Sequence, residues 1–170
     1  LRNEGVTFSF GAFSSVKDFD VIVRSPGVKP GIEPLHEAGD LGIPITSATN
    51  IFLEHAKGTS VGITGTKGKG TTAALLYEIV KAAGSDTYVG GNIGIPALSF
   101  IDIVKPESVS ILELSSFQLI DANKSPHIAI VLMVTSDHMD YHMTPEEYIM
   151  AKMGIAKHQA PDDSIIVNID

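Results

Sequence analysis

Two apolar runs, "SVSILEL" at residues 108–114 and "HIAIVLMV" at residues 127–134, constrain the fold more than any other feature of the sequence. Their apolar residues are nearly continuous and do not alternate with polar ones. This pattern is typical of strands that are covered on both faces in a parallel sheet. Other β-branched runs alternate with segments of helical periodicity, so we predict a layered α/β fold with a mostly parallel sheet.

The same periodicities give the expected elements. Strands are predicted at residues 6–10, 20–24, 43–46, 59–64, 87–90, 109–114, 127–134 and 164–169. Helices are predicted at residues 33–41, 49–55, 71–83, 96–101 and 145–158. Roughly the first 55 residues are expected to form one βα region, and "EHAKGT" at residues 54–59 is a candidate domain joint, with the boundary near Lys57. We therefore divide the chain into residues 1–57 and 58–170.

Composition limits the classes of partner. The chain has 170 residues, 44% of them hydrophobic, with a formal net charge of −8 and no cysteine. The negative charge argues against a nucleic-acid or membrane-surface partner, because both are polyanions. The lack of cysteine fits a reducing compartment, so we expect a cytoplasmic protein. The sequence begins with Leu1 and stops just after the apolar "SIIVNI", and we expect both ends to be internal to a longer protein.

A glycine-rich loop follows the predicted strand at residues 59–64 and precedes a helical pattern. The loop consists of Gly65, Thr66, Lys67, Gly68, Lys69, Gly70, Thr71 and Thr72. Strand, glycine loop and helix in this order form the setting of a phosphate-binding loop, in which backbone N–H groups and the helix N-terminus face a polyphosphate. Lys69 is expected to reach the β- and γ-phosphates. The alternative is a glycine-rich turn with two surface lysines.

The loop departs from the usual G-x-x-x-x-G-K-[ST] pattern at two positions. Ile63 stands where the first glycine belongs, and Gly70 stands where a hydroxyl would bind Mg²⁺. Thr71, one residue later, is therefore expected to supply that hydroxyl.

Polar residues also follow the two long apolar runs, where ligands gather in an open parallel sheet. Glu113 lies at the end of the first run, and a carboxylate there is costly unless it is paired or binds a cation. The second run is followed by four side chains that can bind metal, Asp137, His138, Asp140 and His142. Beside a phosphate loop we expect Mg²⁺. The alternatives are a zinc site and a capping or turn role for the two aspartates.

Lys152 lies within the apolar stripe of the last predicted helix. Thr144, Pro145 and Glu147 give that helix a good start, and Tyr148, Lys152 and Ile155 then share one face. The lysine either points into the active centre or buries its stem and extends its charge to solvent.

Two further motifs lie at predicted strand ends. Ser25, Pro26 and Gly27 follow "DVIVR", and the loop at residues 90–94, which contains Asn92, follows "TYV". Each is either part of a site or plain turn chemistry.

Taken together, these motifs resemble those of the Mur ligase family. The segments that carry the resemblance are "DFDVIVRSPGV", "GITGTKGKGTT", "GGNIGIPAL", "ELSSFQL", "VTSDHMDYH" and the following "MAK". They cover essentially the whole chain in the family's order. The residues after Glu113 resemble the members that add D-glutamate to UDP-N-acetylmuramoyl-L-alanine in peptidoglycan synthesis.

The resemblance implies an architecture. Residues 1–57 would be the Rossmann-like C-terminal half of an N-terminal UDP-binding domain. Residues 58–170 would be the first part of a central ATPase domain with a P-loop and a mostly parallel sheet. The start of the first domain, the rest of the second and a C-terminal domain would then lie outside these residues.

The resemblance also implies a reaction. ATP would phosphorylate a substrate carboxylate, and the amine of D-glutamate would attack the acyl phosphate to give an amide, ADP and phosphate. The implied cofactors are ATP and two Mg²⁺ ions, and the implied partners are UDP-N-acetylmuramoyl-L-alanine and D-glutamate. A monomer is expected.

Roles for single residues follow from the same resemblance. Lys69 would contact the transferring phosphate, Thr71 and Glu113 would hold one Mg²⁺, and His138 with Lys152 would serve a second. The family's matching lysine is carbamylated, which would make Lys152 an anionic ligand.

Other matched positions concern the substrate. The positions that match substrate contacts in the family are Asn92, Ser115 and Gln118 for the muramoyl peptide, and Ser25, Pro26 and Gly27 for the uridine diphosphate.

Two alternatives remain open. The "GTKGKGTT" loop, with Gly70, resembles that of folylpolyglutamate synthases, so a ligase of that kind is the alternative enzyme. The other alternative is a nucleotide-binding fragment without ligase activity of its own, because such catalysis depends on closure of the site.

Overall fold

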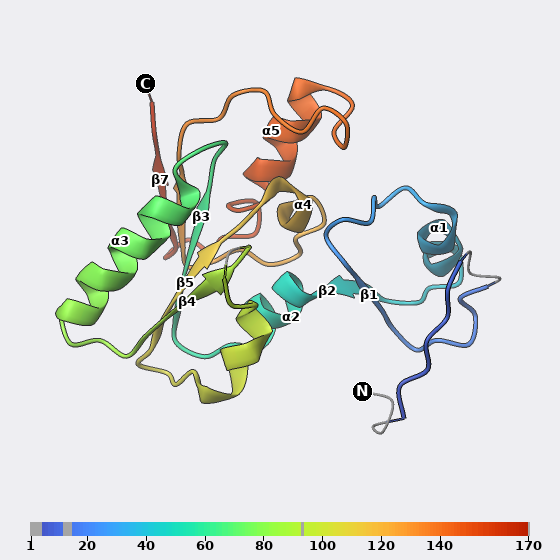
Figure 1. The fold of residues 1–170 in the computed structure, drawn as a ribbon, viewed down its shortest axis with the longest axis horizontal. Helices are drawn as coiled ribbons and strands as arrows, with labels where there is room; N and C mark the ends of the chain where they lie inside the picture. The colour runs from blue at the N-terminus through green and yellow to red at the C-terminus, as the bar shows by residue number, and fades with distance from the viewer. Residues whose placement is uncertain (1–4, 12–14, 93, 170) are drawn as a thin grey trace.

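The computed structural model of the chain describes residues 5–11, 15–92 and 94–169. Figure 1 shows a larger body built on a five-stranded sheet and a smaller lobe that contains α1, β1 and β2. The predicted α/β fold class is confirmed. Ile93, part of the predicted loop at residues 90–94, lies outside the described residues.

The larger sheet has the strand order β4-β5-β3-β6-β7, and every pairing in it is parallel. The strands are β3 (Thr59–Thr64), β4 (Thr87–Gly91), β5 (Val109–Glu113), β6 (Ile128–Val131) and β7 (Ser164–Val167). Strand β3 is central, with Ile63 opposite Glu113 of β5 and Thr64 opposite Val131 of β6. The two long apolar runs thus flank the central strand, where burial on both faces favours continuous apolar sequence.

Helices cover both faces of this sheet. Helix α3 (Lys69–Ala82) packs on one face, where Ala73 lies in a buried cluster with Ile63 and Ile111. The other face carries α2 (Ala48–His55), the 3₁₀ helix η2 (Ala97–Ile103), α4 (Ser116–Leu119) and α5 (Pro145–Met153). Phe52 of α2 and Phe100 of η2 belong to the core on that side.

The smaller lobe is a βαβ unit. Strands β1 (Ile22–Arg24) and β2 (Ile45–Ser47) pair in parallel, and α1 (Glu33–Asp40) connects them. Ser47 ends β2 and caps α2, because its Oγ accepts the N–H of Asn50 at 3.2 Å. Strand β2 belongs to the small sheet and β3 to the large one, so the chain passes from one sheet to the other between them. Helix α2, which lies between these strands, already packs with the larger body. The division at residue 57 therefore stays a prediction.

Several predicted elements differ from the structure. Residues 6–10 form no strand, since no described strand pairs with them. The helix expected at residues 145–158 ends at Met153, where Gly154 is the C-cap and turns follow. The helix expected at residues 96–101 is the 3₁₀ helix at Ala97–Ile103, with Pro96 as its N-cap, and the short helix α4 was not predicted. In α3, Leu75 and Ile79 are exposed, and the face toward the sheet is formed by Ala73 and Leu76.

Strand β7 pairs only with β6 among the described strands and forms one edge of the sheet. Its residues Ile165, Ile166 and Val167 are 45%, 56% and 49% exposed. Within the described ranges, none of the helices has the length and apolar character needed to cross a membrane.

Gly62 in β3 provides a test of the packing between the sheet and the helices. A Cβ atom at Gly62 would lie 2.6 Å from Pro126 Cγ and 3.0 Å from Leu114 Cδ1. We expect Gly62→Ala to lower the free energy of unfolding by about 1–3 kcal/mol through overpacking, as measured by urea denaturation. The control is Gly39→Ala in α1, where a Cβ atom meets nothing within 4 Å. That change is expected to be neutral or stabilising, and equal effects at both glycines would contradict the packing described.

Candidate functional site

The loop between β3 and α3 begins at the centre of the sheet edge. Gly65 has φ 146° and Gly68 has φ 85°, in the region that favours glycine. A Cβ atom on Gly65 would also lie 2.7 Å from Leu132 Cβ. Thr66 anchors the loop, because its N–H donates to Met133 O at 2.9 Å and its hydroxyl donates to Thr135 O at 2.9 Å. The loop is therefore bound to the segment that follows β6.

Two lysines meet at one carbonyl oxygen of this loop. Lys69 Nζ donates to Gly65 O and to Thr66 O, both at 3.1 Å. Lys152 Nζ, from α5, donates to the same Gly65 O at 2.8 Å. Two positive side chains from distant parts of the sequence thus lie at the start of α3, although the protein as a whole is negatively charged.

Lys152 is almost fully buried. The residue is 2% exposed, so the alternative in which its charge extends to solvent is wrong. Burial and, to a smaller extent, the nearby charge of Lys69 lower the pKa of Lys152 to about 8, against the opposite effects of Asp137 and Glu113. Near neutral pH the ammonium therefore predominates, and a minor fraction of the side chain is the neutral amine.

Tyr148 supports this lysine. Its ring lies beneath Lys152, with Nζ 4.5 Å from the ring centroid, and its hydroxyl lies 3.2 Å from Thr66 Oγ1. Tyr148 is 1% exposed, and burial raises the pKa of its phenol. The sequence placed Tyr148 on the face of Lys152, but it gave no sign of the contact with the loop.

The N-terminus of α3 is suited to an anion. The helix has 14 residues, Gly68 provides no side-chain cap, and the first turn contains no acidic residue. The first N–H groups of a helix lack intrahelical acceptors and carry partial positive charge. Together with Lys67, Lys69 and Lys152, they form a region of positive potential that can hold phosphate groups.

Glu113 lies at the end of β5, next to this loop. The residue is 4% exposed, and its Oε1 accepts a hydrogen bond from Asn92 Nδ2 at 3.1 Å. Asn92 also donates its N–H to Glu113 O at 2.9 Å. Among the described residues no donor reaches Oε2 of Glu113. Thr71 is exposed in the first turn of α3 and makes no hydrogen bond to Glu113.

Ser115 and Gln118 bind one another. They form the capping box of α4, in which Gln118 Oε1 accepts the N–H of Ser115 at 2.9 Å and Ser115 Oγ accepts the N–H of Gln118 at 3.3 Å. Gln118 Nε2 also donates to Thr49 Oγ1 of α2 at 3.2 Å. The local S-x-x-Q spacing is the signal that could have predicted this helix start.

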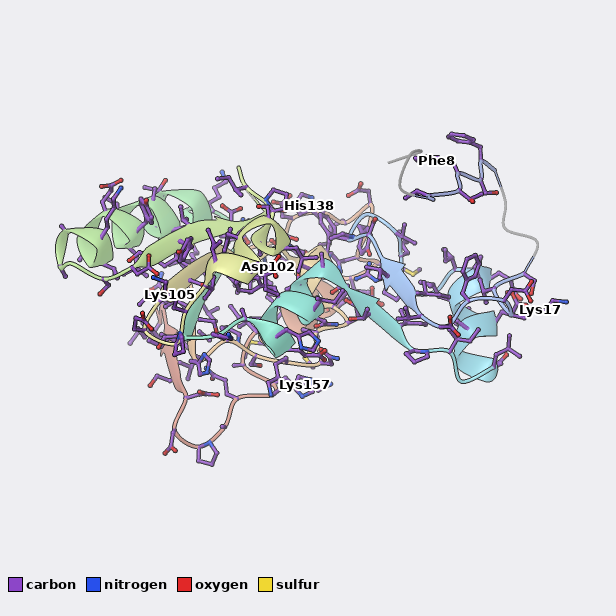
Figure 2. The ribbon with its side chains drawn as sticks, turned by 90° about the horizontal axis from the view of Figure 1, so that it is seen from below. Phe8, Lys17, Asp102, Lys105, His138 and Lys157 are labelled. Carbon is purple, nitrogen blue, oxygen red and sulfur yellow. The ribbon has the colours of Figure 1, made fainter. Side chains whose placement is uncertain are left out.

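The two histidines after β6 lie in different surroundings. His138 is exposed, has φ 54° and lies against the ring of Phe117 at 4.9 Å. His142 is 1% exposed, and its Nε2 lies 2.9 Å from Ser116 Oγ. Among the described residues no three His, Asp or Glu side chains group as metal ligands, so the structure does not gather Asp137, His138, Asp140 and His142 into a site for Mg²⁺ or for zinc. Figure 2 shows His138 between α3 and the small lobe, far from Lys17 at the outer end of that lobe.

Ser25, Pro26 and Gly27 form a turn directly after β1. The N–H of Val28 closes the turn on Ser25 O at 3.0 Å. The hydroxyl of Tyr141, from the loop that contains His138, donates to Pro26 O at 3.2 Å. The turn therefore lies beside the larger body, and Tyr141 is a contact that the sequence did not reveal.

The chain belongs to the Mur ligase family, because residues 63–170 match the family model for the Mur ligase middle domain. The predicted resemblance to this family is confirmed. Two curated relatives are UDP-N-acetylmuramoylalanine–D-glutamate ligases. The enzyme of Symbiobacterium thermophilum is 40% identical over 160 residues, which are 94% of this chain and 35% of the relative. The enzyme of Clostridium acetobutylicum is 39% identical over 172 residues, which are 100% of this chain and 37% of the relative.

This chain thus spans little more than a third of the length of these relatives. Solved structures show the same fold at lower identity. The MurF ligase of Thermotoga maritima in complex with ADP matches with a TM-score of 0.57 and 22% identity over 88% of this chain and 42% of that one. The MurF of Acinetobacter baumannii matches with a TM-score of 0.55 and 19% identity over 72% of this chain and 29% of that one.

The buried ammonium of Lys152 predicts a pH dependence of stability. The pKa is about 8 in the folded chain and 10.5 in the unfolded one, so the unfolded chain binds more protons between these values. We expect the free energy of unfolding to rise by up to about 3 kcal/mol between pH 8 and pH 10.5 relative to the Lys152→Met variant. Urea denaturation of both proteins in CO₂-free buffer measures this difference. Parallel pH profiles for the two proteins would contradict a lowered pKa.

Proposed function

We propose that the complete protein is an ATP-dependent ligase that adds D-glutamate to UDP-N-acetylmuramoyl-L-alanine through an acyl phosphate. The observation that carries this proposal is the meeting of Lys69 and Lys152 at Gly65 O, beside the uncapped start of α3. The names of the relatives suggest the substrates. Residues 1–57 would be the end of a Rossmann-like UDP-binding domain, and residues 58–170 the first part of the ATP-binding domain.

Residues 65–72, which are the loop after β3 and the first turn of α3, would bind ATP as a P-loop. Lys69 would turn from the carbonyls of Gly65 and Thr66 to the β- and γ-phosphates. The γ-phosphoryl group would pass to a carboxylate oxygen of the muramoyl substrate while ADP leaves. The amine of D-glutamate would then attack the carbonyl carbon, lose a proton and displace phosphate. Both steps gather negative charge, which the lysines and the helix N-terminus would stabilise.

Glu113 fits a first Mg²⁺ site, because this buried carboxylate has one oxygen on Asn92 and the other without a donor among the described residues. Thr71 is the proposed second ligand. Bound Mg²⁺ would supply charge neutralisation at the phosphates. A second Mg²⁺ is proposed to bind His138 and an anionic form of Lys152. Near neutral pH the unmodified Lys152 is a mixture of ammonium and neutral amine, and neither form is anionic. A carbamate on Lys152 would be such a ligand.

The neutral fraction of Lys152 makes carbamylation testable, since only the neutral amine attacks CO₂. After incubation of the complete protein with carbon-13 bicarbonate, we expect a carbamate carbon signal in the NMR spectrum. The signal should be missing from Lys152→Met and retained in Lys81→Met, which alters an exposed lysine of α3. A signal of equal size in all three proteins would exclude Lys152 as its source.

The substrate positions are proposed as follows. Ser25, Pro26 and Gly27 would face the uridine diphosphate, and Asn92, Ser115 and Gln118 would face the muramoyl peptide. Asn92, Ser115 and the turn at residues 25–27 follow the carboxyl ends of strands, where such ligands bind, and Gln118 lies in α4 just beyond β5. We also propose that the complete protein acts in the cytoplasm on small molecules, without nucleic acid or membrane. It is expected to be a monomer, and its mass in analytical ultracentrifugation tests this.

Phosphate release by the complete protein tests the proposed function. With Mg·ATP, we expect release that requires both UDP-N-acetylmuramoyl-L-alanine and D-glutamate. A pteroate substrate with glutamate tests the alternative suggested by Gly70, the folylpolyglutamate synthase-like ligase. Release only with pteroate would overturn the proposal in favour of that ligase, and ATP binding without release would favour a nucleotide-binding module.

Variants of the complete protein serve as controls for the mechanism. Lys69→Ala, Glu113→Ala and Lys152→Ala are each expected to lower kcat by about 100-fold or more, because Lys69 would stabilise charge at the transferring phosphate and the other two would hold the Mg²⁺ ions that do so. Lys81→Ala, on the same helix as Lys69 but at its C-terminal end, is expected to keep normal turnover. Near-normal activity of all three site variants would refute the assigned roles.

A further inference from the structure

Arg24, the last residue of β1, is a buried cation at the junction of the lobe and the larger body. The residue is 3% exposed. Its Nε and Nη2 donate to the two carboxylate oxygens of Asp121, both at 2.6 Å, and Nη2 also donates to Phe117 O at 3.0 Å. Asp121 follows α4 by two residues, so this bidentate pair joins β1 to the segment that contains Ser115 and Gln118.

The remaining donor of Arg24 faces the turn at residues 25–28. Nη1 donates to Ser25 O at 3.2 Å, to Pro26 O at 3.3 Å and to Val28 O at 2.5 Å. A single guanidinium thus holds three of the four carbonyl groups of the turn, those of Ser25, Pro26 and Val28, and also binds Asp121 of the larger body. Lysine has no equivalent planar set of donors.

Tyr141 binds two of these carbonyls from the other side of the junction. Its hydroxyl lies 3.2 Å from Pro26 O and 3.1 Å from Val28 O. Lys29 adds a contact in the reverse direction, because its Nζ donates to Asp140 O at 3.0 Å. The turn is therefore held by β1, by the end of α4 and by the loop that contains His138.

The engaged carbonyls determine the direction of the adjacent N–H groups. In a trans peptide the C=O and the following N–H point in opposite directions. Since Pro26 O and Val28 O face Arg24 and Tyr141, the N–H groups of Gly27 and Lys29 face away from them. No described residue accepts either N–H in the structure. Two neighbouring backbone donors are thus directed outward in a fixed orientation, an arrangement that suits an anion.

We infer that Arg24, Asp121 and Tyr141 are positioning residues that fix the turn at residues 25–28 for the diphosphate of the nucleotide substrate. This inference rests on the proposed function for the identity of that substrate. None of the three residues needs to touch the ligand. They act by holding the backbone carbonyls and by fixing the distance between the turn and the loop with His138.

The sharpest variant is Tyr141→Phe in the complete protein, because it removes one hydroxyl and keeps the ring against Phe117. We expect the KM for UDP-N-acetylmuramoyl-L-alanine to rise about three- to tenfold, because the variant loses the hydrogen bonds that orient the turn. The KM for ATP and the melting temperature should stay unchanged. An unchanged KM for the muramoyl nucleotide, or an equal rise in both KM values, would overturn the inference.

The matched control is Tyr88→Phe, which likewise removes one hydrogen-bonded tyrosine hydroxyl. Tyr88 lies in β4, where its hydroxyl contacts Asp86 and Ile103 O, far from the turn. Neither KM should change in this variant. Arg24→Lys is the second test, since it keeps the charge but loses the bidentate pair with Asp121 and the hydrogen bonds to the three carbonyls of the turn. It should raise the same KM as Tyr141→Phe.

Direct binding of uridine diphosphate separates this inference from the proposed function. Calorimetry with the complete protein is expected to give a Kd that is weaker for Tyr141→Phe than for wild type and Tyr88→Phe. If the complete protein shows no ligase activity but Tyr141→Phe still binds uridine diphosphate more weakly than wild type, the positioning role is supported and the proposed reaction is refuted. Equal binding by all three proteins, or no binding by wild type, would refute the positioning role.

Discussion

The parallel pairing of β3 with β5 on one side and β6 on the other is the constraint on which the site depends. Because all strands of the larger sheet run in one direction, the segments that follow them emerge at one edge. The glycine loop, Glu113 with Asn92, and the loop after β6 come together there for that reason. The covered faces supply the apolar cores that keep this edge in place.

Electrostatics at this edge oppose the charge of the chain as a whole. A chain with a formal net charge of −8 places two lysine side chains on a single carbonyl oxygen and leaves the start of α3 without an acidic side chain. The charges repel each other and one of them is desolvated, which is unfavourable in the free protein. A bound polyanion would relieve both penalties, so ligand binding and local stability are expected to be coupled.

Periodicity and turn chemistry were sufficient to predict the parallel sheet, the glycine loop and the start of α5, because each depends on residues that are close in sequence. The inward direction of Lys152 was predicted as one of two alternatives, and only its burial and its contact with Gly65 O decide between them. The pairing of Arg24 with Asp121 could not be predicted, since 97 residues separate the partners. Residues 6–10 have a strand-like sequence, but a strand also requires a partner, and sequence periodicity alone does not supply one.

Strand β7 has a consequence for handling these 170 residues as a separate protein. Its apolar side chains are about half exposed, and no described strand pairs with its outer edge. Such an edge offers backbone donors and acceptors together with apolar surface, which is the combination that promotes intermolecular sheet formation. Self-association of the separate chain should therefore increase with its concentration, and a lysine substituted on the exposed edge of β7 should reduce it.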